Sequence, residues 1–196
     1  KESSAASDVY KRQPQRPLVP ADTNETGGGL ILDHIFAGLE YYDAKGNPQM
    51  EVAESIESED NQNWTIKIKG DTKFSDGTPV TSKSFVDAWN QSVKQSMLNA
   101  SFFESIQGYD EALKAAEAAI EADKENGVGD MDMSGLKVVD DTTFTVALKQ
   151  PESDFPLRLG YSAFYPLPEA GLGDRAKVKA YGENPISNGP YMVKKD

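Results

Sequence analysis

The most constraining feature of this sequence is a short segment at residues 64–69 in which apolar and polar residues alternate strictly. Successive side chains of a β-strand point to opposite faces, so the alternation places Trp64, Ile66 and Ile68 on one face. The other face carries one threonine and two lysines. A strand with one buried and one solvated face is typical of an antiparallel sheet. We therefore expect such a sheet to anchor the fold.

Helical patterns surround this strand and predict a mixed α/β fold. A tight turn at residues 75–79 leads to Thr81, which can cap a helix over 82–95. Phe85, Trp89 and Val93 of that helix are spaced by four residues and form one buried stripe. Weaker patterns predict helices over 30–37 and 109–126, and strands over 39–43, 136–139 and 142–148.

The composition excludes several classes of protein. The chain has 20 Lys and Arg against 32 Asp and Glu, for a net charge of −12, and no basic cluster. This balance argues against binding to nucleic acid or to an anionic membrane surface. The absence of cysteine from the sequence excludes disulfides, thiolate metal sites and cysteine nucleophiles. No apolar run approaches the roughly 18 residues of a membrane-spanning helix.

Few residues suggest catalysis or a cofactor. His34 is the only histidine of the sequence, and no Gly-x-Ser-x-Gly motif accompanies it, so we interpret it as structural. Gly27-Gly28-Gly29 lacks the lysine of a phosphate-binding loop, and no cofactor is expected. A secreted hydrolase that uses carboxylates or His34 remains the alternative hypothesis.

An acidic segment at Asp130–Asp141 partly matches a calcium-binding loop. Oxygen-bearing residues occupy positions 1, 3 and 5, and Gly135 occupies position 6. The last position is Asp141 where Glu is usual, and strand-like residues stand where the exit helix should be. We therefore expect an acidic surface loop and no metal site.

The two ends of the sequence differ in character from the middle. Residues 1–13 are expected to be a disordered tether or an artefact. Lys1–Ser7 are polar and rich in Ser and Ala, as in a tether, and the codons of Asp8–Gln13 can resemble a sequencing adapter. Met192–Lys194 resemble the start of a strand. We therefore expect the sequence to be the N-terminal fragment of a longer chain.

Several stretches of the sequence, taken in order, carry a family resemblance. The most specific is at residues 73–81, Lys-Phe-Ser-Asp-Gly-Thr-Pro-Val-Thr. The others are Ile35–Leu39, Val52–Ser55, Trp64–Ile68, Phe85–Trp89, Val139–Phe144 and Asn188–Tyr191. Together they resemble the peptide- and nickel-binding solute-binding proteins (family 5) that serve ABC importers outside the cytoplasm, and the resemblance covers residues 14–196.

The resemblance implies part of a periplasmic-binding-protein type II fold, in which two lobes close on a ligand. By analogy, residues 14–38 and 156–196 belong to lobe I, and residues 39–155 form an inserted α/β subdomain. The second lobe is expected to be missing from this sequence. The isolated chain is therefore expected to bind peptide weakly or not at all.

The resemblance also implies a ligand-binding function without chemistry. The stretch before the first helix is expected to pair its backbone with an extended peptide; its residues are Asn24, Glu25, Thr26, Gly27 and Gly28. Phe102 and Phe103 are further candidates, although their spacing alone favours the core. The expected protein is not an enzyme: it is a monomer that captures peptides outside the cytoplasm, as a lipoprotein or in the periplasm. It then delivers them to permease subunits.

Overall fold

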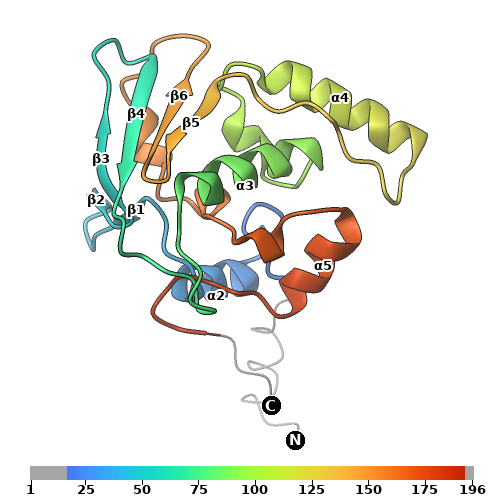
Figure 1. The fold of residues 1–196 in the computed structure, drawn as a ribbon, viewed down its shortest axis with the longest axis horizontal. Helices are drawn as coiled ribbons and strands as arrows, with labels where there is room; N and C mark the ends of the chain where they lie inside the picture. The colour runs from blue at the N-terminus through green and yellow to red at the C-terminus, as the bar shows by residue number, and fades with distance from the viewer. Residues whose placement is uncertain (1–16, 193–196) are drawn as a thin grey trace, which may run out of the picture.

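The computed structural model describes residues 17–192 and has a mixed α/β fold, as the sequence patterns predict (Figure 1). A central helix, α3, lies between a small antiparallel sheet and the remaining helices. None of the helices in the described part of the chain combines the length and the apolar character needed to cross a membrane.

The main sheet has four antiparallel strands in the order β3-β4-β6-β5. Trp64, Ile66 and Ile68 of β4 are buried and their polar neighbours are exposed, which confirms the predicted alternation. Ile66 of β4 is paired with Phe144 of β6 in the centre of the sheet. The strands are β3 (Ala53–Glu57), β4 (Asn63–Ile68), β5 (Leu136–Asp140) and β6 (Thr143–Ala147).

A two-stranded hairpin precedes this sheet. It consists of β1 (Glu40–Tyr42) and β2 (Pro48–Met50), which pair antiparallel. The connecting turn has Gly46 at φ +83°, a conformation that glycine adopts without steric penalty. The Asp43 carboxylate accepts hydrogen bonds from the backbone N–H groups of Lys45 and Asn47, which holds the turn closed.

Helix α3 (Ser82–Lys94) begins where the sequence predicts it, because Thr81 and Ser84 form a reciprocal capping box. Its stripe of Phe85, Trp89 and Val93 is fully buried. The Trp89 ring meets Phe144 of the sheet edge-on at a centroid distance of 5.6 Å.

Trp89 joins α3 to two further segments of the chain. Its ring lies 5.8 Å from that of Phe103 and meets that of Phe164 edge-on at 5.3 Å. Its indole Nε1–H donates a hydrogen bond of 3.1 Å to the carbonyl oxygen of Phe164. A buried tryptophan with a satisfied N–H group combines large apolar burial with a fixed orientation. Trp89 therefore sets the positions of the segments around residues 100–103 and 162–164.

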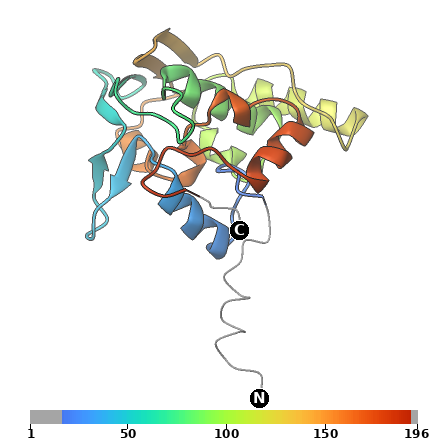
Figure 2. The ribbon, with the colours of Figure 1, turned by 60° about the horizontal axis from the view of Figure 1, so that its bottom comes forward.

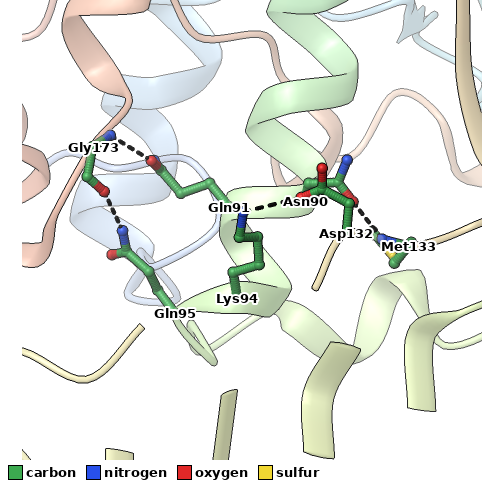
Figure 3. A network of polar contacts seen from close by, with 7 residues as sticks. All are labelled: Asn90, Gln91, Lys94, Gln95, Asp132, Met133 and Gly173. Carbon is green, nitrogen blue, oxygen red and sulfur yellow. Dashed lines mark hydrogen bonds and ion pairs between the residues drawn. The ribbon is translucent and has the colours of Figure 1, made fainter. Parts of the chain in front are cut away.

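The opposite, polar face of α3 holds two loops by their backbone atoms (Figure 3). The Gln91 side chain accepts a hydrogen bond of 2.9 Å from the N–H of Gly173, and Gln95 donates one of 2.7 Å to the carbonyl oxygen of the same glycine. Asn90 accepts a hydrogen bond of 2.8 Å from the N–H of Met133. Buried amide side chains thus replace water as partners of these backbone groups.

The acidic loop at Asp130–Asp141 has a structural role, and its geometry does not match a calcium-binding loop. Asp132 forms an ion pair of 3.0 Å with Lys94, and Met133 is buried. Strand β5 starts at Leu136, so a strand stands where an EF-hand would have the helix that follows its calcium-binding loop. Among residues 17–192, no group of three His, Asp or Glu side chains could hold a metal ion.

Two helices differ in extent from the predictions. Helix α2 spans Thr26–Ile35, so the prediction of a start at residue 30 is wrong. Helix α4 spans Tyr109–Ala122 and ends four residues before its predicted limit. The Asp123 carboxylate accepts hydrogen bonds from the backbone N–H groups of Glu125 and Asn126, and this local turn competes with continuation of the helix.

The remaining elements within residues 17–192 are a last α-helix and four short 3₁₀ helices. These are η1 (Ala100–Phe103), η2 (Phe155–Arg158), η3 (Ser162–Phe164), η4 (Glu169–Gly171) and α5 (Arg175–Glu183). The Asp174 side chain caps α5 by accepting a hydrogen bond from the N–H of Lys177.

One apolar core connects most of these elements, and a smaller separate cluster consists of Val19, Ala21, Met97 and Val178. The main core contains Leu32 of α2 and Phe164 of η3 together with Phe85 and Phe144. The expected tether or artefact at residues 1–13 lies outside the described residues, and so does most of the strand expected to start at Met192.

Replacement of Trp89 by alanine tests the central role of this residue. Trp89→Ala removes the ring contacts and leaves the Phe164 carbonyl without its donor. We expect a loss of about 3–5 kcal/mol in the free energy of unfolding, measured by urea denaturation. The matched control Leu98→Ala removes a 45% exposed side chain and should change stability by at most about 0.5 kcal/mol. Equal effects of the two substitutions would contradict this role.

Candidate functional site

A cavity of about 490 Å³ lies where α2, β1 and the segment around η3 meet. Helix α2 and the hairpin that contains β1 lie next to each other in both views of the molecule (Figures 1 and 2). None of the described residues that line the cavity is Lys or Arg. The lining side chains that matter most are Asp33, Glu40, Glu51, Tyr42, Tyr161 and Tyr165. The cavity is therefore acidic and largely aromatic.

Glu40 is the most unusual residue of this wall. Only 3% of its surface is exposed, and its Oε2 atom has no hydrogen-bond partner. Burial raises the pKa of the Glu40 carboxyl group from 4.5 to about 7. A buried carboxyl oxygen without a hydrogen-bond partner is energetically unfavourable, so its presence in the wall requires an explanation.

Two glycines let the backbone close around Glu40. A Cβ atom at Gly160 would lie 2.8 Å from the ring of Tyr42 and 3.1 Å from the carbonyl oxygen of Glu40. A Cβ atom at Gly38 would lie 2.9 Å from the ring of Tyr165. The two distances to the tyrosine rings are shorter than real Cβ contacts, so a larger residue at either position would displace a ring of the cavity wall beside Glu40.

Asp33 and Tyr165 form a second polar contact in the wall. The Tyr165 hydroxyl donates a hydrogen bond of 2.8 Å to Oδ1 of Asp33. The Tyr165 ring stacks on Phe36 at a centroid distance of 6.0 Å. Burial, and then the nearby Asp33 carboxylate, raise the pKa of the Tyr165 hydroxyl far above its ordinary value. Tyr165 thus stays a neutral hydrogen-bond donor at any physiological pH.

An aromatic ridge runs from the cavity toward η1. It consists of Tyr42, Tyr161 and Phe102, whose ring centroids follow one another at 5.5 and 5.7 Å. The Tyr42 hydroxyl donates a hydrogen bond of 2.7 Å to the carbonyl oxygen of Leu157, and burial and Tyr161 raise its pKa to about 12. Tyr161 and Phe102 are 45% and 39% exposed, so the ridge offers apolar surface to a ligand.

The expected ligand stretch Asn24–Gly28 lies at the start of α2. Because the helix begins at Thr26, the backbone of Thr26, Gly27 and Gly28 is helical and not extended. The Gly29 N–H already donates to the carbonyl oxygen of Glu25. These three residues therefore offer no extended backbone with which a peptide could pair as an added strand. Asn24 and Thr26 are exposed, and a contact between this stretch and a ligand stays a prediction.

The two expected phenylalanines have different positions. Phe103 is fully buried in the core, whereas Phe102 belongs to the aromatic ridge. Asn99 connects η1 to the segment before α2, since its side chain donates a hydrogen bond of 3.1 Å to the carbonyl oxygen of Thr23. The structure thus brings Phe102 and the start of α2 to the same region of the molecule.

His34 lies in the last turn of α2 and is exposed. Its Nδ1 atom makes a hydrogen bond of 2.6 Å with the carbonyl oxygen of Leu30 in its own helix. This local contact provides no orientation for a general base, and the geometry gives no support to the hydrolase hypothesis.

A larger hollow of about 590 Å³ lies between the turn at residues 75–79, α3 and η4. Its charged groups include Lys83 and Asp87, which form an exposed ion pair of 3.8 Å. Solvated charges of this kind need no ligand. The acidic cavity is therefore the stronger candidate site.

Sequence patterns do not reveal this cavity, although two signals exist. Glu40 interrupts an otherwise apolar and aromatic strand between Leu39 and Tyr41, and the aromatic residues around Tyr161 and Tyr165 are dense. Their convergence depends on tertiary contacts between segments that lie about 120 residues apart in the sequence.

The family model described as "Bacterial extracellular solute-binding proteins, family 5 Middle" matches residues 47–195. This match covers more than half of the chain. The chain belongs to this family. The resemblance inferred from the sequence motifs is thereby confirmed, and members of the family are substrate-binding proteins and not enzymes.

Curated relatives of this family 5 chain include two peptide-binding proteins. The periplasmic oligopeptide-binding protein OppA of Escherichia coli is 32% identical over 168 residues, which are 84% of this chain and 29% of OppA. The dipeptide-binding protein of Lactococcus lactis is 31% identical over 174 residues, which are 85% of this chain and 29% of that protein. The chain thus spans less than a third of the length of these relatives.

Solved structures give the same result for the fold. The substrate-binding domain of an oligopeptide ABC transporter from Bacillus anthracis matches with a TM-score of 0.74 and 27% identity. The match covers 93% of this chain and 34% of that structure. The murein tripeptide-binding protein MppA in its unliganded open form matches with a TM-score of 0.78 and 25% identity, over 91% of this chain and 33% of MppA. The expected partial lobe of a type II periplasmic binding protein is confirmed.

The raised pKa of Glu40 predicts a stability difference that depends on pH. The folded state keeps the Glu40 proton up to about pH 7, whereas the unfolded chain loses it near pH 4.5, so folding becomes less favourable as pH rises through this window. Glu40→Gln stays neutral. We expect it to be more stable than the wild type at pH 8, by up to about 3 kcal/mol, and nearly equal at pH 4.

Urea denaturation of both proteins at the two pH values measures this difference. The control Glu54→Gln changes an exposed carboxylate on the neighbouring strand β3 and should have an effect within about 0.5 kcal/mol at both values. A constant difference between Glu40→Gln and the wild type across the pH range would be inconsistent with a buried, titrating Glu40.

Proposed function

We propose that this chain is part of the substrate-binding subunit of an ABC importer, and that the subunit captures peptides outside the cytoplasm and delivers them to the permease. One observation carries this proposal: the family 5 match over residues 47–195, whose relatives are named for binding oligopeptides and dipeptides. The name of the Bacillus anthracis structure links this fold to an oligopeptide ABC transporter.

The proposed peptide contacts are the start of α2 and the aromatic ridge. Asn24, Glu25, Thr26 and Gly27 provide exposed or partly exposed groups at one end of α2, and the buried Gly28 belongs to the same proposed stretch. Phe102 provides an apolar surface for a peptide side chain, and Phe103 supports it from the core. Backbone hydrogen bonds and roomy apolar surfaces accept many peptide sequences, which suits a general importer.

The proposed mechanism is binding followed by closure. Residues 14–38 and 156–196 would belong to the first lobe, and residues 39–155 would form the inserted subdomain. A ligand that contacts two lobes favours the closed state, and the permease recognises that state. In this proposal the receptor acts as a monomer, is held at the cell surface as a lipoprotein or in the periplasm, and performs no chemistry.

Calorimetric titration of the full-length gene product that contains this chain tests the proposal. The titrants are alanine-rich peptides of two to nine residues, with maltose and a nickel–histidine complex as other solutes. We expect peptides of at least one length to bind with a dissociation constant in the micromolar range or below, and the other solutes not to bind. Binding of maltose or nickel in the absence of any peptide binding would refute the proposal.

Two matched samples sharpen this test. A peptide of the same sequence with methylated backbone nitrogens should bind at least tenfold more weakly, because it lacks the N–H donors. Mass spectrometry of the incubated peptides should find no cleavage products with the wild type or with His34→Ala. Cleavage by the wild type that His34→Ala abolishes would favour the hydrolase hypothesis instead.

Phe102 gives a residue-level prediction for peptide binding. Phe102→Ala removes an exposed ring of the ridge and should weaken peptide binding about tenfold, since aromatic anchors contribute strongly to binding. Val139→Ala alters another exposed apolar residue, on β5, and should leave affinity unchanged. Calorimetry compares the two variants, and equal affinities would exclude Phe102 from the binding surface.

A further inference from the structure

One oxygen atom of the Glu40 carboxyl group has no hydrogen-bond partner, and this points to a ligand for the acidic cavity. The side chain is 3% exposed, lines the cavity and leaves Oε2 without a hydrogen-bond partner. Buried carboxylates in proteins are normally paired with a cation or with several donors. Here the described lining contains neither Lys nor Arg.

The other charged residues that line the cavity are both acidic. Asp33 comes from α2 and Glu51 follows β2, while the neutral Tyr165 comes from the segment after η3. The Asp33 carboxylate already accepts the Tyr165 hydroxyl, so its partner is neutral and its charge is not compensated there. The Lys69 charge opposes the rise that burial causes in the pKa of Glu51, but Lys69 does not line the cavity. His34 of α2 is directed to its own helix.

The aromatic part of the wall suits the same kind of ligand. The rings of Tyr42, Tyr161 and Tyr165 line the cavity beside the carboxyl groups. Aromatic rings attract cations through the negative face of the π system, and tyrosine-lined cages recognise organic cations in this way. A cavity of about 490 Å³ has room for an alkylammonium or alkylguanidinium group.

We infer that this cavity binds an organic cation, an ammonium or a guanidinium group, between the Glu40 carboxylate and the rings of Tyr42, Tyr161 and Tyr165. For a peptide-binding receptor, the cation would be a basic side chain or the amino terminus of the peptide. That peptide form of the inference rests on the proposed function, whereas the binding of a small cation does not.

The first experiment uses a small probe, arginine amide, and the full-length gene product that contains this chain. Tyrosine fluorescence or calorimetry should detect saturable binding to the wild type. Glu40→Gln, which preserves shape and removes the charge, should weaken binding at least tenfold, and Tyr161→Leu should weaken it several-fold. Glu54→Gln, an exposed carboxylate on β3, is the matched control and should bind as the wild type does. No binding by the wild type, or equal binding by Glu40→Gln, would overturn the inference.

The pH dependence gives an independent readout. N-acetylarginine amide keeps its guanidinium charge at all accessible pH values. Burial raises the pKa of Glu40 to about 7, so binding of the cation must displace a proton at lower pH. Affinity should rise up to tenfold per pH unit between pH 5 and 7 and level off above pH 8. Glu40→Gln should lose this dependence, and a dependence unchanged in that variant would contradict the assignment.

The second experiment uses tetrapeptides to distinguish the two sources of the cation. The peptides carry either arginine or methionine at each of the four positions in turn. Each peptide is made with a free and with an acetylated amino terminus. A preference for arginine that Glu40→Gln abolishes identifies a basic side chain, and a loss on acetylation that the variant abolishes identifies the amino terminus. Equal peptide binding by wild type and variant refutes the peptide form of the inference and leaves the proposed function intact. If arginine amide binds through Glu40 but no peptide binds, the proposed function fails and the cation site stands.

Discussion

The fold depends on Trp89, because this one side chain holds together parts of the molecule that come from distant regions of the sequence. Its ring packs against Phe144 of the sheet, Phe103 of η1 and Phe164 of η3, and its N–H group binds the carbonyl oxygen of Phe164. The segment fixed in this way continues directly into Tyr165, which lines the acidic cavity. The geometry of the cavity wall is therefore set from inside the core.

The sequence predicts the regular part of this architecture well. The alternation of Trp64, Ile66 and Ile68 and the stripe on α3 are local patterns that report directly on burial. The start of α2 is missed because glycines at positions 27–29 argue against a helix, whereas contacts such as that between Asn99 and Thr23 anchor this end of the chain. The cavity is missed for a similar reason, because Glu40 and Tyr161 meet only through long-range packing.

Glu40 shows how a binding protein differs from one optimised for stability alone. A glutamine or an apolar residue at this position would avoid the burial of an ionisable group, and Gly38 and Gly160 let the backbone and the tyrosine rings pack closely beside it. An arrangement that is unfavourable in the free protein can become favourable when a complementary charge enters. Strain of this kind is concentrated where proteins recognise ligands.

The polar face of α3 has a consequence for how this protein can vary. Asn90, Gln91 and Gln95 hold two loops through the backbone atoms of Met133 and Gly173. Because every amino acid except proline carries the same backbone groups, these contacts do not specify the side chains of the loops. The two anchoring residues are constrained in other ways, since the Met133 side chain is buried in the core and Gly173 has φ +147°. Only the exposed loop residues between such anchors are free to diverge, so new surface loops can be grafted there while the framework and the two anchors stay the same.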